Sequence, residues 1–137
     1  MILIDTHAIV WLTEGNPRFG KRARVTIERA VAAREALVST ASFWEVGMLL
    51  SKRRIALSLP LSEWADALAS RAGFKIVTVD APIAIEAGSL PDGIHGDPGD
   101  RFIVATARIM EAPILTADRK ILDCAELGHV SVIDARH

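Results

Sequence analysis

Residues 1–5 (MILID) open the chain with a short apolar run that is closed by the acid Asp5. A continuous apolar run of this length is typical of a strand buried on both faces, the kind that parallel sheets use. Residues 113–117 (PILTA) repeat the arrangement near the other end of the chain, where Asp118 follows them. Ligands bind in the crevice outside the carboxyl ends of parallel strands, so we expect Asp5 and Asp118 to face one crevice.

Between these two runs, short apolar segments alternate with segments of helical periodicity. Further strands are predicted at residues 36–38, 75–79, 114–115 and 130–133. Helices are predicted over residues 6–13, 21–34, 62–71 (capped by Ser62), 81–88, 100–111 and 119–124, with another that ends near residue 52 and a loop over 91–99. Strands that alternate with helices imply right-handed crossovers, and therefore an α/β protein whose parallel sheet carries helices on both faces.

The composition is that of a globular domain, with half of the residues hydrophobic and 24% charged. Its 137 residues suffice for one domain, 1–137, that buries about two-thirds of its unfolded surface. A net charge of -1 argues against a protein that coats nucleic acid by bulk attraction, although a metal ion can supply local positive charge. A single cysteine, Cys124, fits a reducing setting, and no apolar run approaches the ~18 residues of a membrane span. We expect a cytoplasmic protein without membrane contact.

Three further acids lie where helices are predicted to begin. Asp97 and Asp100 precede the apolar run 102–105, and Glu45 follows residues 39–44 (STASFW). Carboxylates brought together with those at the strand ends repel one another by roughly 4 kcal/mol per close pair at an effective dielectric near 20. Such a cluster persists only if some groups are protonated or a cation lies among them. The pattern therefore predicts a metal site.

Each of these acids also has a structural interpretation. Asp5, Asp97 or Asp100, and Asp118 are placed to cap helices, and Ser42-x-x-Glu45 matches a capping box. Because Ser, Thr and Asn cap as well as Asp does, acids at all these corners exceed what capping requires. The two interpretations are compatible, since a capping carboxylate keeps lone pairs for a cation.

The donor types indicate which cation is expected. Hard oxygen donors without a convergent His or Cys pattern suit Mg²⁺ or Mn²⁺ better than zinc. A carboxylate-held metal that accepts phosphate oxygens suits displacement at phosphorus by an activated water. A structural calcium site is the alternative, but the chain has no Asp-x-Asp-x-Asp-Gly calcium loop.

Four motifs in this order resemble the acidic signature of PIN-domain ribonucleases, and within that family the VapC-type toxins. They are residues 4–7 (IDTH), 42–45 (SFWE), 97–101 (DPGDR) and 115–118 (LTAD), and the likeness runs from residue 1 to about residue 133. The resemblance implies a three-layer α/β/α sandwich and a metal-dependent endoribonuclease that acts as the toxin of a bacterial toxin–antitoxin pair. It also implies an RNA substrate, a small antitoxin partner, and a homodimer or a toxin–antitoxin hetero-oligomer.

The resemblance assigns site roles by position. It implies that four acids hold the Mg²⁺ or Mn²⁺ ion and position the water, namely Asp5, Glu45, Asp100 and Asp118. Asp97 matches the first acid of an Asp-Pro-x-Asp-Arg variant, while Thr116 and Thr6 match hydroxyl residues beside the last and first acids. The chain departs from the family at Gly99, where relatives often carry a bulky residue, commonly Phe, so we expect a looser loop there.

Other side chains near these motifs are weaker candidates. Arg101 is placed to contact a phosphate or to pair with a neighbouring acid. His7 and His95 are possible proton carriers, but a lone His more often packs or bonds locally. Of the tryptophans, which are able to stack bases, we expect core or interface packing. Part of the apolar surface of residues 45–50 is predicted to accept an antitoxin segment, together with Leu57, Leu61 and Trp64.

Two other functional classes compete with the nuclease. One is a non-catalytic module whose acids receive an antitoxin's basic segment or a structural ion. The other is a phosphotransfer domain of the receiver or haloacid-dehalogenase type. Those domains need a lysine after a late strand or Asp-x-Asp after the first, whereas here the first strand ends in residues 5–7 (DTH).

Overall fold

The computed structural model describes residues 1–91, 94 and 97–137, and within these residues five strands form one sheet. The order of the strands is β3-β2-β1-β4-β5, and every neighbouring pair is parallel. The strands are β1 (Ile2–Ile4), β2 (Ala36–Ser39), β3 (Phe74–Val77), β4 (Ile114–Thr116) and β5 (Val132–Asp134). The predicted α/β class with a parallel central sheet is confirmed.

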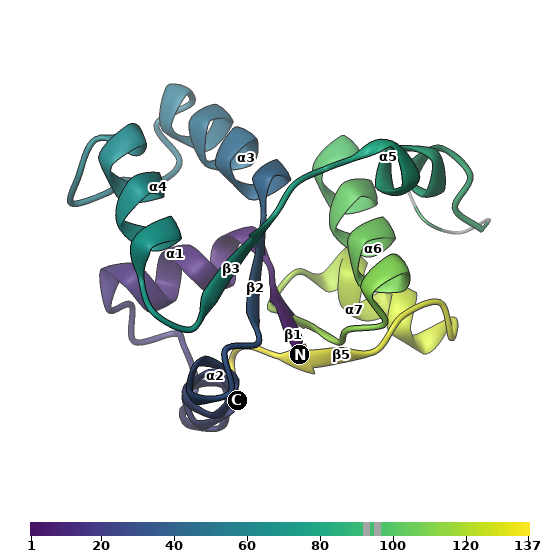
Figure 1. Ribbon diagram of the computed structural model, residues 1–137, viewed down its shortest axis with the longest axis horizontal. Coiled ribbons are helices and arrows are strands. Elements are labelled where there is room, and N and C mark those ends of the chain that lie inside the picture. The colour runs from purple at the N-terminus through teal and green to yellow at the C-terminus, as the bar shows by residue number, and fades with distance from the viewer. Residues whose placement is uncertain (92–93, 95–96) are drawn as a thin grey trace.

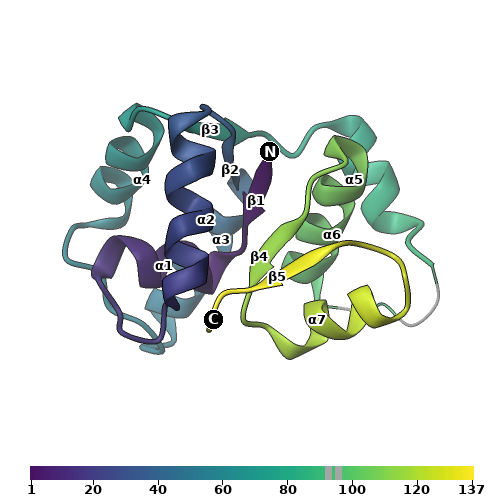
Figure 2. The ribbon, with the colours of Figure 1, turned by 90° about the horizontal axis from the view of Figure 1, so that it is seen from below.

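Helices cover both faces of the sheet, so the expected three-layer sandwich is also confirmed (Figures 1 and 2). On one side lie α1 (Thr6–Glu14), α2 (Lys21–Ala32), α3 (Thr40–Ser51) and α4 (Leu61–Ser70). On the other side lie α5 (Ala81–Gly88), α6 (Pro98–Met110) and α7 (Arg119–Glu126). No helix of the described residues is both long and apolar enough to cross a membrane.

Side-chain alternation along the short strands divides the core in two. Ile2 and Ile4 of β1 pack in a cluster with residues of α1 to α4. Leu3, between them, packs in a second cluster with Ile103 of α6 and Ile121 of α7. Because successive side chains of a strand point to opposite faces, a strand covered on both faces is apolar at every position. This is why residues 2–4 form an unbroken apolar run.

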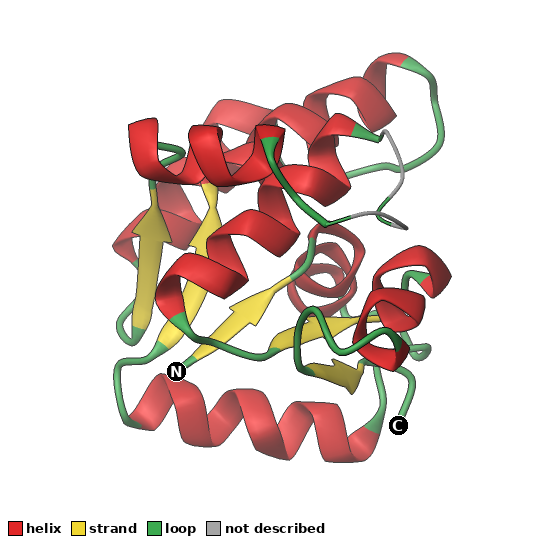
Figure 3. Ribbon diagram, turned by 90° about the vertical axis from the view of Figure 1, so that its right-hand side faces the viewer, coloured by secondary structure: helices red, strands yellow, loops and turns green. Residues whose placement is uncertain are grey.

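The strand order places the candidate acids at one edge of the sheet. Within the sheet, β2 and β3 lie to one side of the central strand β1, and β4 and β5, which come later in the chain, lie to the other. The reversal beside β1 is a topological switch point, where open α/β sheets bind ligands outside the carboxyl ends of strands. The Asp5 N–H donates to Leu115 O at 2.9 Å, so the ends of β1 and β4 are joined there. The strands fan out from one another across the twisted sheet (Figure 3).

Two predicted helix starts are wrong by one or two residues. Helix α4 begins at Leu61 with Pro60 in the cap position and no side-chain cap, so Ser62 lies inside the helix. Helix α6 begins at Pro98 rather than at Asp100, because Asp97 accepts from the Asp100 N–H at 3.2 Å and proline suits the first helical position.

The buried β1 strand gives a direct test of the fold. Leu3 is 0% exposed, so Leu3→Ala should lower the free energy of unfolding by about 3 kcal/mol, through lost burial and the cavity left behind. The control is Leu127→Ala, because Leu127 is 56% exposed and its truncation should change stability by less than about 0.5 kcal/mol. Chemical denaturation measures both. Equal losses in the two variants would contradict the core described here.

Candidate functional site

The Asp5 carboxylate lies at the carboxyl end of β1 and is only 3% exposed. Its Oδ1 accepts from the Thr6 N–H at 2.8 Å, and its Oδ2 accepts from the Thr116 hydroxyl at 2.7 Å. Burial raises the pKa of Asp5, and these two hydrogen bonds oppose the rise. Asp5 therefore does cap α1, and each of its oxygens retains a lone pair for a further ligand.

Thr116 connects Asp5 to the second strand-end acid. Its hydroxyl donates to Asp5 and accepts from the Asp118 N–H at 2.9 Å, and its side chain is completely buried. Asp118 caps α7 by accepting from the Lys120 N–H at 2.8 Å. The charge of Asp118 also contributes to the raised pKa of Asp5, so the two strand-end acids lie near enough to repel each other.

Glu45 reaches the end of β1 from α3, where it contacts Thr6, but the predicted capping box is wrong. Ser39 caps this helix by accepting from the Ala41 N–H at 3.0 Å, so Ser42 and Glu45 lie inside the helix. The Thr6 hydroxyl bonds to the Ser42 hydroxyl at 2.9 Å and donates to Glu45 Oε1 at 3.1 Å. Glu45, which lies one helical turn after Ser42, therefore points toward the carboxyl end of β1 and not toward the start of its own helix.

Asp100 completes a group of four acids. It lies half-buried in the first turn of α6, behind the exposed cap Asp97. Burial raises its pKa to about 7, and the charges of Asp118, Asp97 and Asp5 add to the rise. Burial likewise raises the pKa of Glu45 to about 8, with added repulsion from Asp5, Asp100 and Asp97. The pKa values of Asp5, Glu45 and Asp100 are thus each raised in part by the charge of a neighbouring acid.

The weaker candidates, Arg101, His7 and His95, differ in what the structure shows of them. Arg101 donates to the carbonyls of Ala87 at 2.9 Å and Ile94 at 3.1 Å, and among the described residues its guanidinium forms no ion pair. His7 is exposed, and its charge lowers the pKa of Asp5. His95 lies outside the described residues.

The three tryptophans occupy different environments. Trp64 is 4% exposed, packs edge-to-face with Phe43 at 6.1 Å and donates from Nε1 to Thr13 Oγ1 at 3.0 Å, which matches the core packing expected of it. Trp44 is 50% exposed on α3, so it is not a core residue, and Trp11 is half-buried. The sequence does not distinguish these environments, because each tryptophan lies in a similar apolar helical segment.

The four acids have the right donor atoms for a divalent cation, but their side chains are not close enough together to coordinate one as they stand. All four offer hard carboxylate oxygens, and a bound cation would relieve the burial and repulsion that raise three of their pKa values. In the part of the chain that the structure describes, no three His, Cys, Asp or Glu side chains are placed to hold a metal ion as they stand. Mutually repelling carboxylates lie further apart without a cation than around one, because the cation offsets their repulsion.

Sequence reasoning missed one basic residue of this site. Lys120 is exposed in the first turn of α7, two residues after Asp118, and its charge lowers the pKa of Asp100. The sequence feature that could have identified Lys120 is its position two residues after the last acid. That position alone does not predict a role at the site, because a lysine on a short amphipathic helix is ordinarily solvated.

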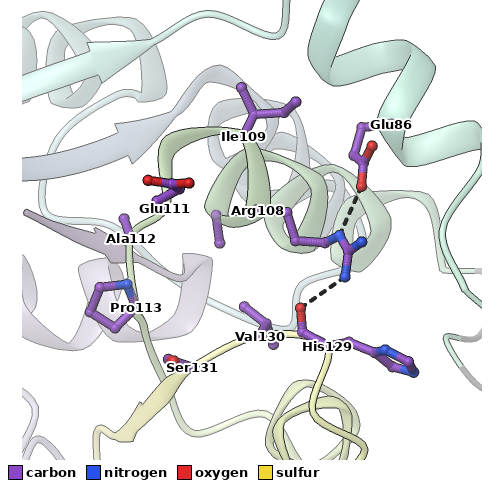
Figure 4. A pocket seen from close by; sticks show the side chains of 10 residues that line it. Glu86, Arg108, Ile109, Glu111, Ala112, Pro113, His129, Val130 and Ser131 are labelled. Carbon is purple, nitrogen blue, oxygen red and sulfur yellow. Dashed lines mark hydrogen bonds and ion pairs between the residues drawn. The ribbon is translucent and has the colours of Figure 1, made fainter.

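A cleft of about 510 Å³ lies at the opposite ends of the strands (Figure 4). Pro113 and Ser131, which line it, precede β4 and β5. Inside it, Arg108 donates to Glu86 Oε1 at 2.8 Å and to the carbonyl of His129 at 2.9 Å (Figure 4). The cleft is therefore separate from the group of acids, and two nitrogens of the Arg108 guanidinium, Nε and Nη1, are already hydrogen-bonded.

Comparison with known proteins decides the family. The family model for the PIN domain matches residues 2–127. The chain belongs to the PIN-domain family. Ribonuclease VapC22 from Mycobacterium tuberculosis is 32% identical to this PIN domain over 120 residues, which cover 88% of each chain.

Solved structures share the architecture of this PIN domain at low sequence identity. VapBC2 from Rickettsia felis, bound to a DNA fragment from its promoter, has a TM-score of 0.70 at 17% identity and covers 97% of this chain and 98% of that one. FitAcB from Neisseria gonorrhoeae has a TM-score of 0.68 at 20% identity and covers 100% and 99%. A toxin–antitoxin complex from Klebsiella pneumoniae has a TM-score of 0.63 at 20% identity and covers 98% of both.

The raised pKa values predict how stability depends on pH without a cation. The folded state holds protons on Glu45 up to about pH 8 and on Asp100 up to about pH 7, whereas their unfolded values are 4.5 and 3.8. Between these values the folded state binds more protons, so the free energy of unfolding should fall as pH rises. Denaturant unfolding in EDTA across this window measures the slope.

The matched control for this pH dependence is Glu45→Gln, which removes one titrating group and should flatten the slope between pH 4.5 and about 8. A wild-type stability that stays constant or rises across the window would contradict the described environment of these acids.

Proposed function

We propose that this PIN domain, residues 1–137, is a Mg²⁺- or Mn²⁺-dependent endoribonuclease that acts in the cytoplasm as the toxin of a toxin–antitoxin pair. The observation that carries the proposal is the convergence of Asp5, Glu45, Asp100 and Asp118 at the switch point of the sheet, three of them with raised pKa values. The 32% identity to a protein named as a ribonuclease supports RNA as the substrate. The fold shared with toxin–antitoxin complexes is consistent with the proposed toxin role.

In this proposal the four acids hold the cation, and their own hydrogen bonds orient two of them. Asp5 is held by the Thr6 N–H and the Thr116 hydroxyl, and Asp118 by its backbone bond to Thr116. A bound Mg²⁺ or Mn²⁺ supplies Lewis-acid chemistry, polarising a phosphodiester oxygen and lowering the pKa of water. Thr6 and Thr116 are thus supporting residues that orient carboxylates.

Proton transfer falls to one of the four acids. Hydrolysis by an attacking water needs a group that accepts its proton, and a carboxylate within hydrogen-bond reach can serve as that general base. We propose that one carboxylate of the group takes this role. Lys120, exposed near Asp100, is placed to contact a phosphate of the RNA.

Asp5→Asn tests the proposed nuclease activity. Asparagine keeps an acceptor oxygen for the Thr6 N–H but loses the charge, so cleavage of total cellular RNA should be abolished while the fold persists. In EDTA its thermal midpoint should equal or exceed that of the wild type, because a buried ionisable group has been removed. Wild-type cleavage should require Mg²⁺ or Mn²⁺ and stop with EDTA.

The matched control for the cleavage assay is Asp66→Asn, which changes an exposed acid on α4 and should leave cleavage unchanged. Full activity of Asp5→Asn, or cleavage by the wild type in EDTA, would refute the mechanism. A folded wild type without any cleavage would instead favour the non-catalytic binding module.

The proposed antitoxin surface lies around residues 57–64. Leu57 and Leu61 are half-buried against the first core cluster, and Leu59 between them is 42% exposed. Leu59 lines a small groove between α1 and α4, of which buried Trp64 forms part of the wall. An amphipathic segment of the antitoxin is proposed to place its apolar side chains there. Met48, within residues 45–50 of α3, and the neighbouring Trp44 are also exposed and are proposed to extend this antitoxin surface.

Leu59→Asp tests the antitoxin surface. A charge in an apolar contact should weaken binding of a co-expressed candidate antitoxin by at least about tenfold, measured by surface plasmon resonance. Leu127→Asp changes an exposed leucine just after α7 and should bind as the wild type does. Helix α7 lies on the other side of the molecule from α4 (Figure 1). If both variants bind equally well, the groove between α1 and α4 is not the antitoxin site.

A further inference from the structure

Gly99 is a buried glycine in the first turn of α6, and the Glu45 side chain fills the space beside it. A Cβ atom added at Gly99 would lie 2.5 Å from Glu45 Oε1 and 2.8 Å from Glu45 Cγ. A Cβ atom and a non-bonded carbon or oxygen atom do not approach each other so closely. The carboxyl group of Glu45 can therefore occupy its present position only because residue 99 has no side chain.

The usual reasons for a glycine do not explain this one. Its backbone is not in the left-handed region, which Gly15, Gly73 and Gly128 do adopt. The nearest atoms to the added Cβ all belong to the Glu45 side chain and not to a backbone segment. Alanine is also the better helix former, so glycine here lowers the stability of α6. What remains is the room that it leaves for Glu45.

The atoms that alanine would displace lie toward the end of a flexible side chain. Gly99→Ala should therefore leave the backbone in place and turn the Glu45 carboxyl group out of its position. That movement would break the bond from the Thr6 hydroxyl, which now reaches Glu45 at 3.1 Å. The predicted loop over 91–99 is thus wrong at its end, because Pro98 and Gly99 lie in the first turn of α6.

We propose that Gly99 is a positioning residue whose missing side chain keeps the Glu45 carboxylate within the acidic group, a proposal that rests on the proposed metal-dependent function. Gly99 acts through Glu45, whose carboxyl group also accepts a hydrogen bond from the Thr6 hydroxyl. The consequence is specific. A single methyl group at position 99 should weaken cation binding while the fold stays intact.

The experiment compares four proteins with the wild type: Gly99→Ala, Glu45→Ala, the double variant that combines them, and the control Gly88→Ala. Gly88 ends helix α5 and has nothing within 4 Å of an added Cβ, so its substitution matches the chemistry without the contact. Isothermal titration calorimetry measures Mn²⁺ affinity, thermal unfolding in EDTA measures stability, and RNA cleavage is recorded in parallel.

Gly99→Ala should bind Mn²⁺ about tenfold more weakly than the wild type, the usual effect of removing support from a metal ligand, with an unchanged or higher thermal midpoint. Gly88→Ala should keep wild-type affinity. In the Glu45→Ala background, the added Gly99→Ala change should have no further effect on affinity, because the displaced group is already absent.

Three results would overturn the proposal: wild-type Mn²⁺ affinity in Gly99→Ala, an equal loss with and without Glu45, or a lowered midpoint that explains the loss as unfolding. These outcomes are distinct from failure of the nuclease assignment. A wild type that cleaves no RNA but shows the predicted coupling in Mn²⁺ affinity would refute the nuclease and support the positioning role. A wild type that cleaves RNA without the coupling would do the reverse.

Discussion

Burial of the Asp5 carboxylate at the end of the central strand is the constraint on which the other features of the site depend. Removing a carboxylate from water costs roughly several kcal/mol, so it persists only where hydrogen bonds and favourable dipoles surround it. The start of α1 supplies one N–H and its positive dipole end, and the Thr116 hydroxyl supplies a second donor. These bonds lower the pKa of Asp5 but leave it above its ordinary value.

Two threonines extend this arrangement to the neighbouring acids. Thr116 joins Asp5 to the backbone of Asp118, and Thr6, beside Asp5, reaches Glu45 across the gap between α1 and α3. The hydroxyl groups thus orient acids that would otherwise move apart by mutual repulsion. Without a cation, the repulsion between these acids lowers the stability of the fold. Functional sites commonly reduce stability in this way.

The positions of the acids were predictable because they depend on local patterns: apolar runs mark buried strands, and alternation with helices makes the sheet parallel. What depends on tertiary contacts was not predictable. The spacing of Ser42 and Glu45 matches a capping box, yet Ser39 is the residue that caps the helix. Ser42 and Glu45 therefore lie inside the helix, where both side chains contact Thr6. The sequence marks Gly99 as a departure from the family, but only the packing of Glu45 against it shows why glycine fits there.

The four acids, which come from separate elements, are proposed to form one cation site. Diffraction from crystals soaked in Mn²⁺, with data collected at the manganese absorption edge, locates a bound ion. We expect an anomalous peak in contact with carboxylate oxygens of Asp5, Glu45, Asp100 and Asp118. A crystal in which these carboxylates enclose no peak, whether manganese binds elsewhere or nowhere, would refute the proposed site.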